Sequence, residues 1–147
     1  MDDLELRSVI YRRFASHGVP PSRHELIELI GSEKEATARL RRLHDAHMIV
    51  LDDRPHRAGE IRMALPFSSE PTDYRVTTDD GGWWANCAWD SLAIVAALGR
   101  DAHVESTWSD TGESLDFDVV DGQLSRRDGF VYFQVPARHW WDDIVFT

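Results

Sequence analysis

The sequence has little cysteine, no long apolar run and, in its second half, few basic residues. One cysteine in 147 residues cannot form an internal disulfide, which is typical of a protein from a reducing compartment. No apolar run approaches the roughly 20 residues that a membrane-spanning helix needs. The first residues, MDDLELRSVIYRR, begin with acids and lack the apolar stretch of a signal peptide. We therefore expect a cytoplasmic protein without a membrane segment.

Charge divides the chain into two unlike halves. Residues 1–63 contain 11 Lys and Arg against 11 Asp and Glu, whereas residues 64–147 contain 5 against 15. The second half thus accounts for the whole formal net charge of −10. Because an acidic surface repels phosphate backbones, we expect no nucleic acid partner for the second half. The neutral first half is not excluded on this ground.

Three helices and a β-hairpin are predicted for residues 1–66. The first helix ends at Gly18, and the second begins after Ser22 as N-cap and ends at Gly31. The third begins with Ser32 and Glu35 in capping-box spacing and runs into a β-prone stretch over 48–52. A second strand is predicted over 60–67. This order resembles a winged-helix fold.

The remaining residues, 67–147, are predicted to form a core domain. The segment PFSSEPTDY (66–74) has the composition of a linker, and a mostly apolar helix over 87–99 is expected to be buried on most sides. Alternating or β-prone stretches predict strands over 74–78, 102–107, 114–120 and 129–136, and the end of the chain over 142–147 also has a strand-like pattern. The predicted fold class is therefore α+β: a winged-helix-like three-helix N-terminal domain (1–66), then a core (67–147) of one buried helix packed on an antiparallel sheet.

The single cysteine, Cys87, lies in the stretch DDGGWWANCAWDSL, at the predicted start of the core helix. Asn86 is a favourable N-cap, which makes Cys87 the first helical residue. Unpaired backbone N–H groups and the helix dipole should lower the pKa of the thiol there below its free value of about 8.5. Asp90 follows three residues later, so its carboxylate falls on the same helix face. The spacing thus predicts a reactive pair, in which a thiolate binds a soft metal and a carboxylate carries a proton.

Three tryptophans, Trp83, Trp84 and Trp89, flank this pair and are candidates for the apolar walls of a site. Each of these residues also has a purely structural interpretation. A lone cysteine is commonly a small buried hydrophobic residue, Asp90 can close a capping box, and tryptophans fill cores. The spacing alone leaves both interpretations open.

The ordered stretch NCAWDSLAIVAALGRDAHVESTWSDTGESLDFDV (86–119) resembles the core of organomercurial (alkylmercury) lyases. Members of that family carry Cys-x-x-Asp at the start of a helix, a small-residue stretch ending in Gly-Arg, and a strand that begins with Val. A Thr-Gly turn then precedes the next strand. The segments GFVYFQVP and WWDDIVF resemble the next strand and segment of the family. The resemblance is strong over 76–120 and weak over the first 65 residues.

This resemblance implies protonolysis of a carbon–mercury bond. It assigns Cys87 as the catalytic cysteine that binds mercury, and Asp90 as the catalytic aspartate that carries the proton. Mercury is then the substrate, so no cofactor is expected, although small thiols are expected to release the product. The expected partner is an organomercurial compound or Hg(II), with no membrane and no nucleic acid.

The resemblance places a second catalytic cysteine just beyond DDIVFT, where the 147 residues end. A fragment of a longer protein, or a selenocysteine codon read as a stop, are two interpretations that stay open. With one thiol, we expect slow cleavage or none. Two alternatives are therefore kept: a catalytically weak or inactive relative that binds soft metals, and a winged-helix metal-responsive regulator. In the second alternative Arg39, Arg41 and Arg42 would contact phosphates.

Overall fold

Capping side chains begin the N-terminal helices close to the predicted positions in the computed structural model, which describes residues 1–145. The three helices are α1 (Asp3–His17), α2 (Arg23–Ile30) and α3 (Glu33–Asp45). The Ser22 hydroxyl accepts a hydrogen bond from the amide of Glu25, and the Glu25 carboxylate accepts one from the amide of Ser22. Gly18 and Gly31 end α1 and α2 in the left-handed conformation, so the predicted stops are confirmed.

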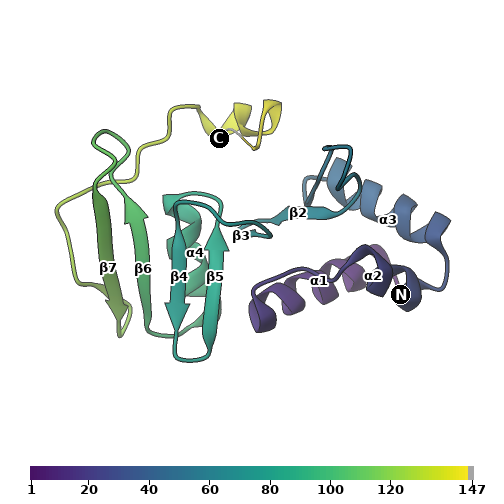
Figure 1. Ribbon diagram of the computed structural model, residues 1–147, viewed down its shortest axis with the longest axis horizontal. Helices are drawn as coiled ribbons and strands as arrows, with labels where there is room; N and C mark the ends of the chain where they lie inside the picture. Colours follow the sequence, from purple (N-terminus) through teal and green to yellow (C-terminus); the bar gives the residue numbers. More distant parts are fainter. Residues whose placement is uncertain (146–147) are drawn as a thin grey trace.

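One antiparallel sheet runs from the N-terminal part into the core (Figure 1), in the order β1-β2-β3-β5-β4-β6-β7-β8. Its strands are β1 (Val50–Leu51), β2 (Ile61–Ala64), β3 (Phe67–Ser68), β4 (Arg75–Thr78), β5 (Gly81–Ala85), β6 (Ala102–Thr107), β7 (Ser114–Val120) and β8 (Gln123–Leu124). The predicted linker over 66–74 is wrong at its start. Phe67 is buried there, and β3 pairs with both β2 and β5. A continuous sheet therefore joins the two predicted domains.

The N-terminal helices pack on the core. The indole N–H of Trp83 on β5 donates to the backbone carbonyl of Phe14 at 2.8 Å, and the Phe14 ring stacks on Phe67 with centroids 5.5 Å apart. Gly18 approaches β5 so closely that a Cβ atom would lie 2.6 Å from the carbonyl oxygen of Gly82. A side chain at position 18 would therefore push α1 away from the core, in addition to straining its left-handed backbone.

Helix α4 (Ala88–Leu98) packs against β4, β5 and β6. It buries Ser91, Ile94 and Val95, and the other face is open, with Trp89 54% exposed and the small side chains of Ala96 and Ala97 also exposed. The prediction of a helix buried on most sides is therefore wrong. The coarser prediction, one helix packed on an antiparallel sheet, is confirmed.

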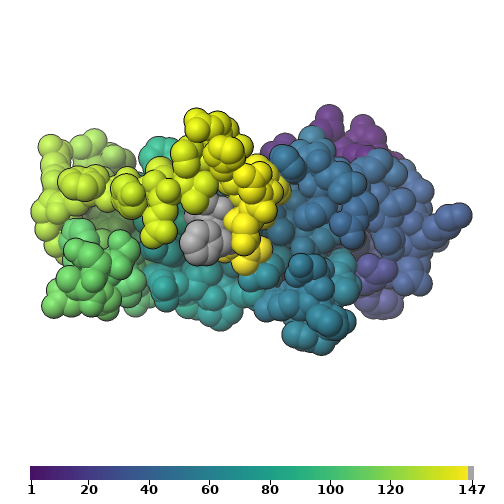
Figure 2. All heavy atoms as spheres, turned by 90° about the horizontal axis from the view of Figure 1, so that it is seen from above, coloured from purple at the N-terminus to yellow at the C-terminus, as the bar shows by residue number. Residues whose placement is uncertain are grey.

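The chain leaves the sheet after β8 and crosses over it toward the N-terminal part (Figure 2). Residues 129–136 form no strand, and residues 137–142 form a short 3-10 helix, η1 (Ala137–Asp142). The predicted strand over 129–136 is wrong, and so is the strand expected over 142–145; residues 146 and 147 lie outside the described part. Aromatic side chains of this segment pack on one another and on α4, for example Phe133 with Trp140 and Trp89, so they stabilise a crossing segment and not a sheet edge.

Within residues 1–145, no helix combines the length and the apolar character needed to cross a bilayer. The same residues contain no cluster of three or more histidine, cysteine or acidic side chains arranged to hold a metal ion.

Candidate functional site

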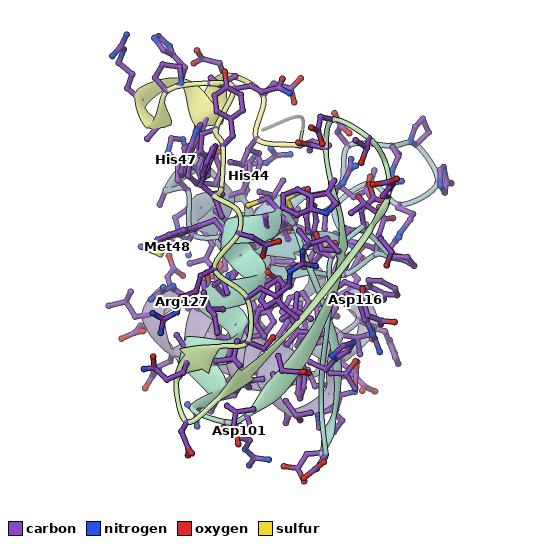
Figure 3. All side chains as sticks on the ribbon, turned by 90° about the vertical axis from the view of Figure 1, so that its left-hand side faces the viewer. His44, His47, Met48, Asp101, Asp116 and Arg127 are labelled. Carbon is purple, nitrogen blue, oxygen red and sulfur yellow. The ribbon has the colours of Figure 1, made fainter. Side chains whose placement is uncertain are left out.

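A cavity of about 810 Å³ lies between the first turns of α4, the strands β6 and β7, and residues 126–135, which we call the strap. Cys87, Ala88, Ser91 and Leu92 line it from the start of α4. The strap is the yellow-green segment that passes over the molecule in Figure 2, and its residue Arg127 is labelled in Figure 3. The predicted start of the core helix therefore opens onto a space of substrate size.

The N-cap of α4 is Cys87, the residue before the helix begins, and not Asn86 as predicted. The predicted cap is thus wrong by one position. The Cys87 carbonyl still accepts the first helical hydrogen bond, from the amide of Ser91 at 3.1 Å, but its side chain makes no capping hydrogen bond. The half-buried thiol is the only one in the sequence.

The thiol of Cys87 has a raised pKa, which contradicts the predicted lowering. Burial is the largest cause, and the negative charge of Asp90 adds to it. The backbone amides of Asp90 and Trp89 act in the opposite direction and offset only part of the increase. The predicted lowering came from the helix end alone, without the loss of hydration and the neighbouring carboxylate. In the free protein, Cys87 therefore holds its proton at neutral pH.

Asp90 is a half-buried carboxylic acid, and no cation among residues 1–145 lowers its pKa. Burial raises its pKa to about 6, and a hydrogen bond from Asn86 offsets part of this increase. The donor is the Asn86 side-chain amide, 3.0 Å from Oδ2 of Asp90. Asp90 itself is not among the residues that line the cavity, so the expectation that both groups face one cleft holds for Cys87 only. The two groups are nevertheless close enough to interact electrostatically.

The three tryptophans do not wall the cavity, and this prediction is wrong. Trp83 is buried against α1, Trp84 lies under the guanidinium of Arg75 at 4.4 Å, and Trp89 is exposed beside the strap residue Phe133. Adjacent strand residues point to opposite faces of a sheet, so Trp83 and Trp84 cannot both face one site.

Other aromatic residues supply the walls. They come from separate parts of the chain: Tyr74, Trp108, Phe117, Phe130, Tyr132 and Phe133. Burial raises the pKa of the Tyr74 phenol, and the negative charges of Cys87 and Asp73 add to the increase. The alternation of Leu115 and Phe117 with acids on β7 was the available signal, since it puts both apolar side chains on one face. The sequence did not identify the strap residues as walls of the cavity, because the strand predicted over 129–136 does not form.

Among the described residues, those of the N-terminal helices do not line the cavity. They contact the C-terminal segment at another point, where His47 after α3 stacks on Trp141 with ring centroids 4.0 Å apart (Figure 3). Two of the three arginines considered for phosphate contact are engaged internally. Arg39 and Arg42 form ion pairs with Asp3 and Glu35.

The Cys87 thiol can give up its proton and bind a soft metal ion through its sulfur, and the neighbouring Asp90 carboxylate can accept that proton. When a metal displaces the proton of Cys87, Asp90 is a candidate acceptor, because its charge acts on Cys87 and its pKa of about 6 suits proton transfer. Sulfur is the ligand that soft metal ions prefer. The arrangement therefore supports metal binding coupled to movement of one proton.

The sequence model of the MerB alkylmercury lyase family matches residues 67–147. Among solved structures, the chain is similar to the mercury-bound form of MerB2, a crystal structure to which it is 25% identical with a TM-score of 0.63. The match covers 84% of this chain and 58% of the MerB2 chain, so this chain spans less than two thirds of that protein. No curated protein matches.

Proposed function

The chain belongs to the alkylmercury lyase family, and we propose that it cleaves carbon–mercury bonds by protonolysis. Cys87 would bind the mercury and Asp90 would deliver the proton. The observation that carries this proposal is the pairing of a cavity-lining thiol with a buried carboxyl whose pKa is raised to about 6. No cofactor is required, because mercury arrives as part of the substrate.

The first step is capture of the organomercurial cation, R–Hg⁺, by Cys87. A sulfur–mercury bond forms, and the thiol proton leaves. Asp90 takes this proton, because a carboxylate that lacks a compensating cation is a stronger base than an ordinary aspartate. The protein thereby keeps the proton beside the mercury and does not lose it to solvent.

The second step returns that proton to carbon. The electron pair of the carbon–mercury bond takes the proton from Asp90 and forms R–H, while mercury(II) stays on the Cys87 sulfur. Asp90 is then a carboxylate again. A further soft ligand must stabilise mercury as carbon departs, and we propose that a small external thiol can fill this position and later remove the product.

The N-terminal part has a supporting role in this proposal. Residues 1–66 would form a winged-helix-like domain and residues 67–147 the lyase-like core, a division supported by the helix order and by the start of the family match at residue 67. The internal ion pairs of Arg39 and Arg42 favour this role over nucleic acid binding. A reducing cytoplasm would keep Cys87 free and supply the small thiols.

The test separates mercury binding from bond cleavage. Purified wild-type protein, Cys87→Ser and Asp90→Asn are each loaded with one equivalent of phenylmercury, and benzene is measured over time with excess added thiol. Cys87→Ser should bind no mercury that survives gel filtration. Asp90→Asn should bind as the wild type does and release benzene about 10²- to 10⁴-fold more slowly, the range expected for loss of a general acid.

Ser91→Ala is the matched control, because Ser91 lines the same cavity and its hydroxyl donates only to the carbonyl of Ala88. It should bind mercury and release benzene as the wild type does. Benzene release by Cys87→Ser at the wild-type rate would refute the proposal. If the wild type binds mercury and releases no benzene, the chain is a mercury-binding relative without lyase activity. The presence of one thiol in the 147 residues is the reason for this alternative.

A further inference from the structure

We propose that Asn86 is a positioning residue that determines which oxygen of Asp90 carries the proton. The inference rests on the proposed function, since it assigns how the acid of that reaction is held. Its evidence is a pair of hydrogen bonds that the Cys-x-x-Asp spacing does not contain.

The orientation of the Asn86 side chain is fixed by the backbone of Pro66. Asn86 Nδ2 lies 3.1 Å from the Pro66 carbonyl oxygen, which can only accept a hydrogen bond. The amino group and not the oxygen of the amide must therefore face Pro66. A reversed amide would bring two acceptors together.

The second hydrogen of the same amino group is directed to Asp90. Nδ2 is 3.0 Å from Oδ2 of Asp90, so one amino group joins the turn before β3 to the first turn of α4. Asn86 Oδ1 is buried and has no partner among residues 1–145. The side chain is thus held through its amino group alone, which leaves one acceptor unsatisfied.

This geometry makes the two oxygens of Asp90 inequivalent. Oδ2 accepts the hydrogen bond from Asn86 most strongly as the carbonyl oxygen of the acid, because a carbonyl oxygen is a better acceptor than a hydroxyl oxygen. This hydrogen bond therefore favours the form of the acid that carries its transferable proton on Oδ1. Fixing one oxygen also stops the carboxyl from rotating between capture of the thiol proton and its delivery to carbon.

The experiment compares Asn86→Leu with Thr72→Val. Leucine has nearly the size of asparagine and no N–H. The Thr72 hydroxyl donates to the Ala85 carbonyl at 2.6 Å, so its removal loosens the same end of β5 without touching Asp90. Each variant is loaded with one equivalent of phenylmercury, and mercury retention and first-turnover benzene release are measured separately.

Asn86→Leu should retain one mercury and release benzene about 10- to 100-fold more slowly, as expected when a reacting group is misplaced by a fraction of an ångström. Thr72→Val should match the wild type in both measurements. Equal slowing in the two variants would overturn the inference, because the effect would then be a general loosening of the strand. Equal rates in Asn86→Leu and the wild type would overturn it as well.

A second measurement needs no catalysis and no Asn86 variant. The two side-chain N–H signals of Asn86 are followed by ¹⁵N NMR in the wild type and in Asp90→Ala without mercury. One of them should move clearly when its acceptor is removed, while the signal that faces Pro66 changes little. Unchanged signals would refute the positioning role. If the wild type fails to release benzene, the proposed function fails alone, and this spectrum still decides the inference.

Discussion

Asp52 in the N-terminal part is buried and Asp90 in the core is half-buried, and the two carboxyl groups have different neighbours. The Asp52 side chain is fully buried and accepts hydrogen bonds from the amide and the guanidinium of Arg54, both at 2.9 Å. Arg57 lies 3.8 Å away, and both arginines also pair with Glu70. The hydrogen bond from Arg54 is the main reason that the pKa of Asp52 lies well below its usual range. Asp90 has one neutral donor, Asn86, and a pKa raised to about 6.

The difference distinguishes an aspartate that stabilises the fold from an aspartate that is suited to proton transfer. Asp52 keeps its charge at all ordinary pH values, because cations offset its loss of hydration. Its network connects the turn between β1 and β2 to the segment after β3 and holds the sheet together there. Asp90 has no such compensation, so it gains and loses a proton near neutral pH at small free-energy cost. Burial without a cation is what suits it to proton transfer.

The largest effect on stability should come from Asp52→Asn. The substitution keeps the shape and removes the charge that pairs with Arg54, so we expect a loss of about 3 kcal/mol of unfolding free energy at pH 7. Because the folded pKa of Asp52 is depressed, its stabilisation is present above the unfolded pKa of about 3.9 and is lost as pH falls through the lower folded value. Urea unfolding at several pH values checks this.

In that experiment the gap between wild type and Asp52→Asn should narrow below pH 4. Arg54→Lys is a useful companion, since it keeps a positive charge and loses the forked contact with the carboxylate. A gap that stays constant between pH 7 and pH 3 would contradict the ion-pair explanation.

A smaller effect of opposite sign is expected from Asp90→Asn. The folded pKa is raised from 3.8 to about 6, so the contribution of Asp90 to stability is fully present below pH 4 and is lost as pH rises through 6. Replacing it by a neutral isostere should therefore stabilise the protein by about 1–2 kcal/mol at pH 8, an amount reduced for partial exposure. At pH 4 the two proteins should have equal stability. Destabilisation at pH 8 would show that another group compensates the charged form of Asp90.

The smallest effect should come from an exposed pair. His103 and Asp118 face each other on β6 and β7 with Nδ1 and Oδ1 2.8 Å apart, and both side chains are about half exposed. Asp118→Asn should change the unfolding free energy by less than about 0.5 kcal/mol, because water already solvates both groups. Thermal unfolding at low and high salt tests this, and a loss comparable to that of Asp52→Asn would remove the distinction between buried and exposed acids.

Local signals predicted the elements whose bounds are set by local chemistry. Ser22, Gly18 and Gly31 act within one turn, and the predicted helices follow them closely. The errors arose where tertiary contacts decide. Phe67 lies in the sheet, where it stacks on Phe14. The strap forms no strand, and its residue Phe133 packs on Trp89 of α4 and Trp140 of η1. No neighbouring residues in sequence carry that information.

The candidate site divides in the same way. Spacing identified Cys87 and Asp90, and the family resemblance gave them roles, but the predicted pKa of Cys87 was wrong in direction and no pKa shift was predicted for Asp90. Burial in the folded protein is the largest cause of both shifts, and spacing along the chain does not give it. Asn86 was assigned to the wrong contact, as a helix cap, because its true partner Pro66 lies 20 residues earlier in the chain.

The most direct test is a titration of both buried aspartates in one sample, with the carboxyl carbons followed by ¹³C NMR between pH 3 and pH 8. Asp90 should titrate with a midpoint near 6, and Asp52 should show no transition above pH 3. Asp90→Asn identifies the Asp90 signal by its absence. A midpoint for Asp90 near 4, as for an ordinary aspartate, would contradict the claim that its surroundings prepare it to carry a proton.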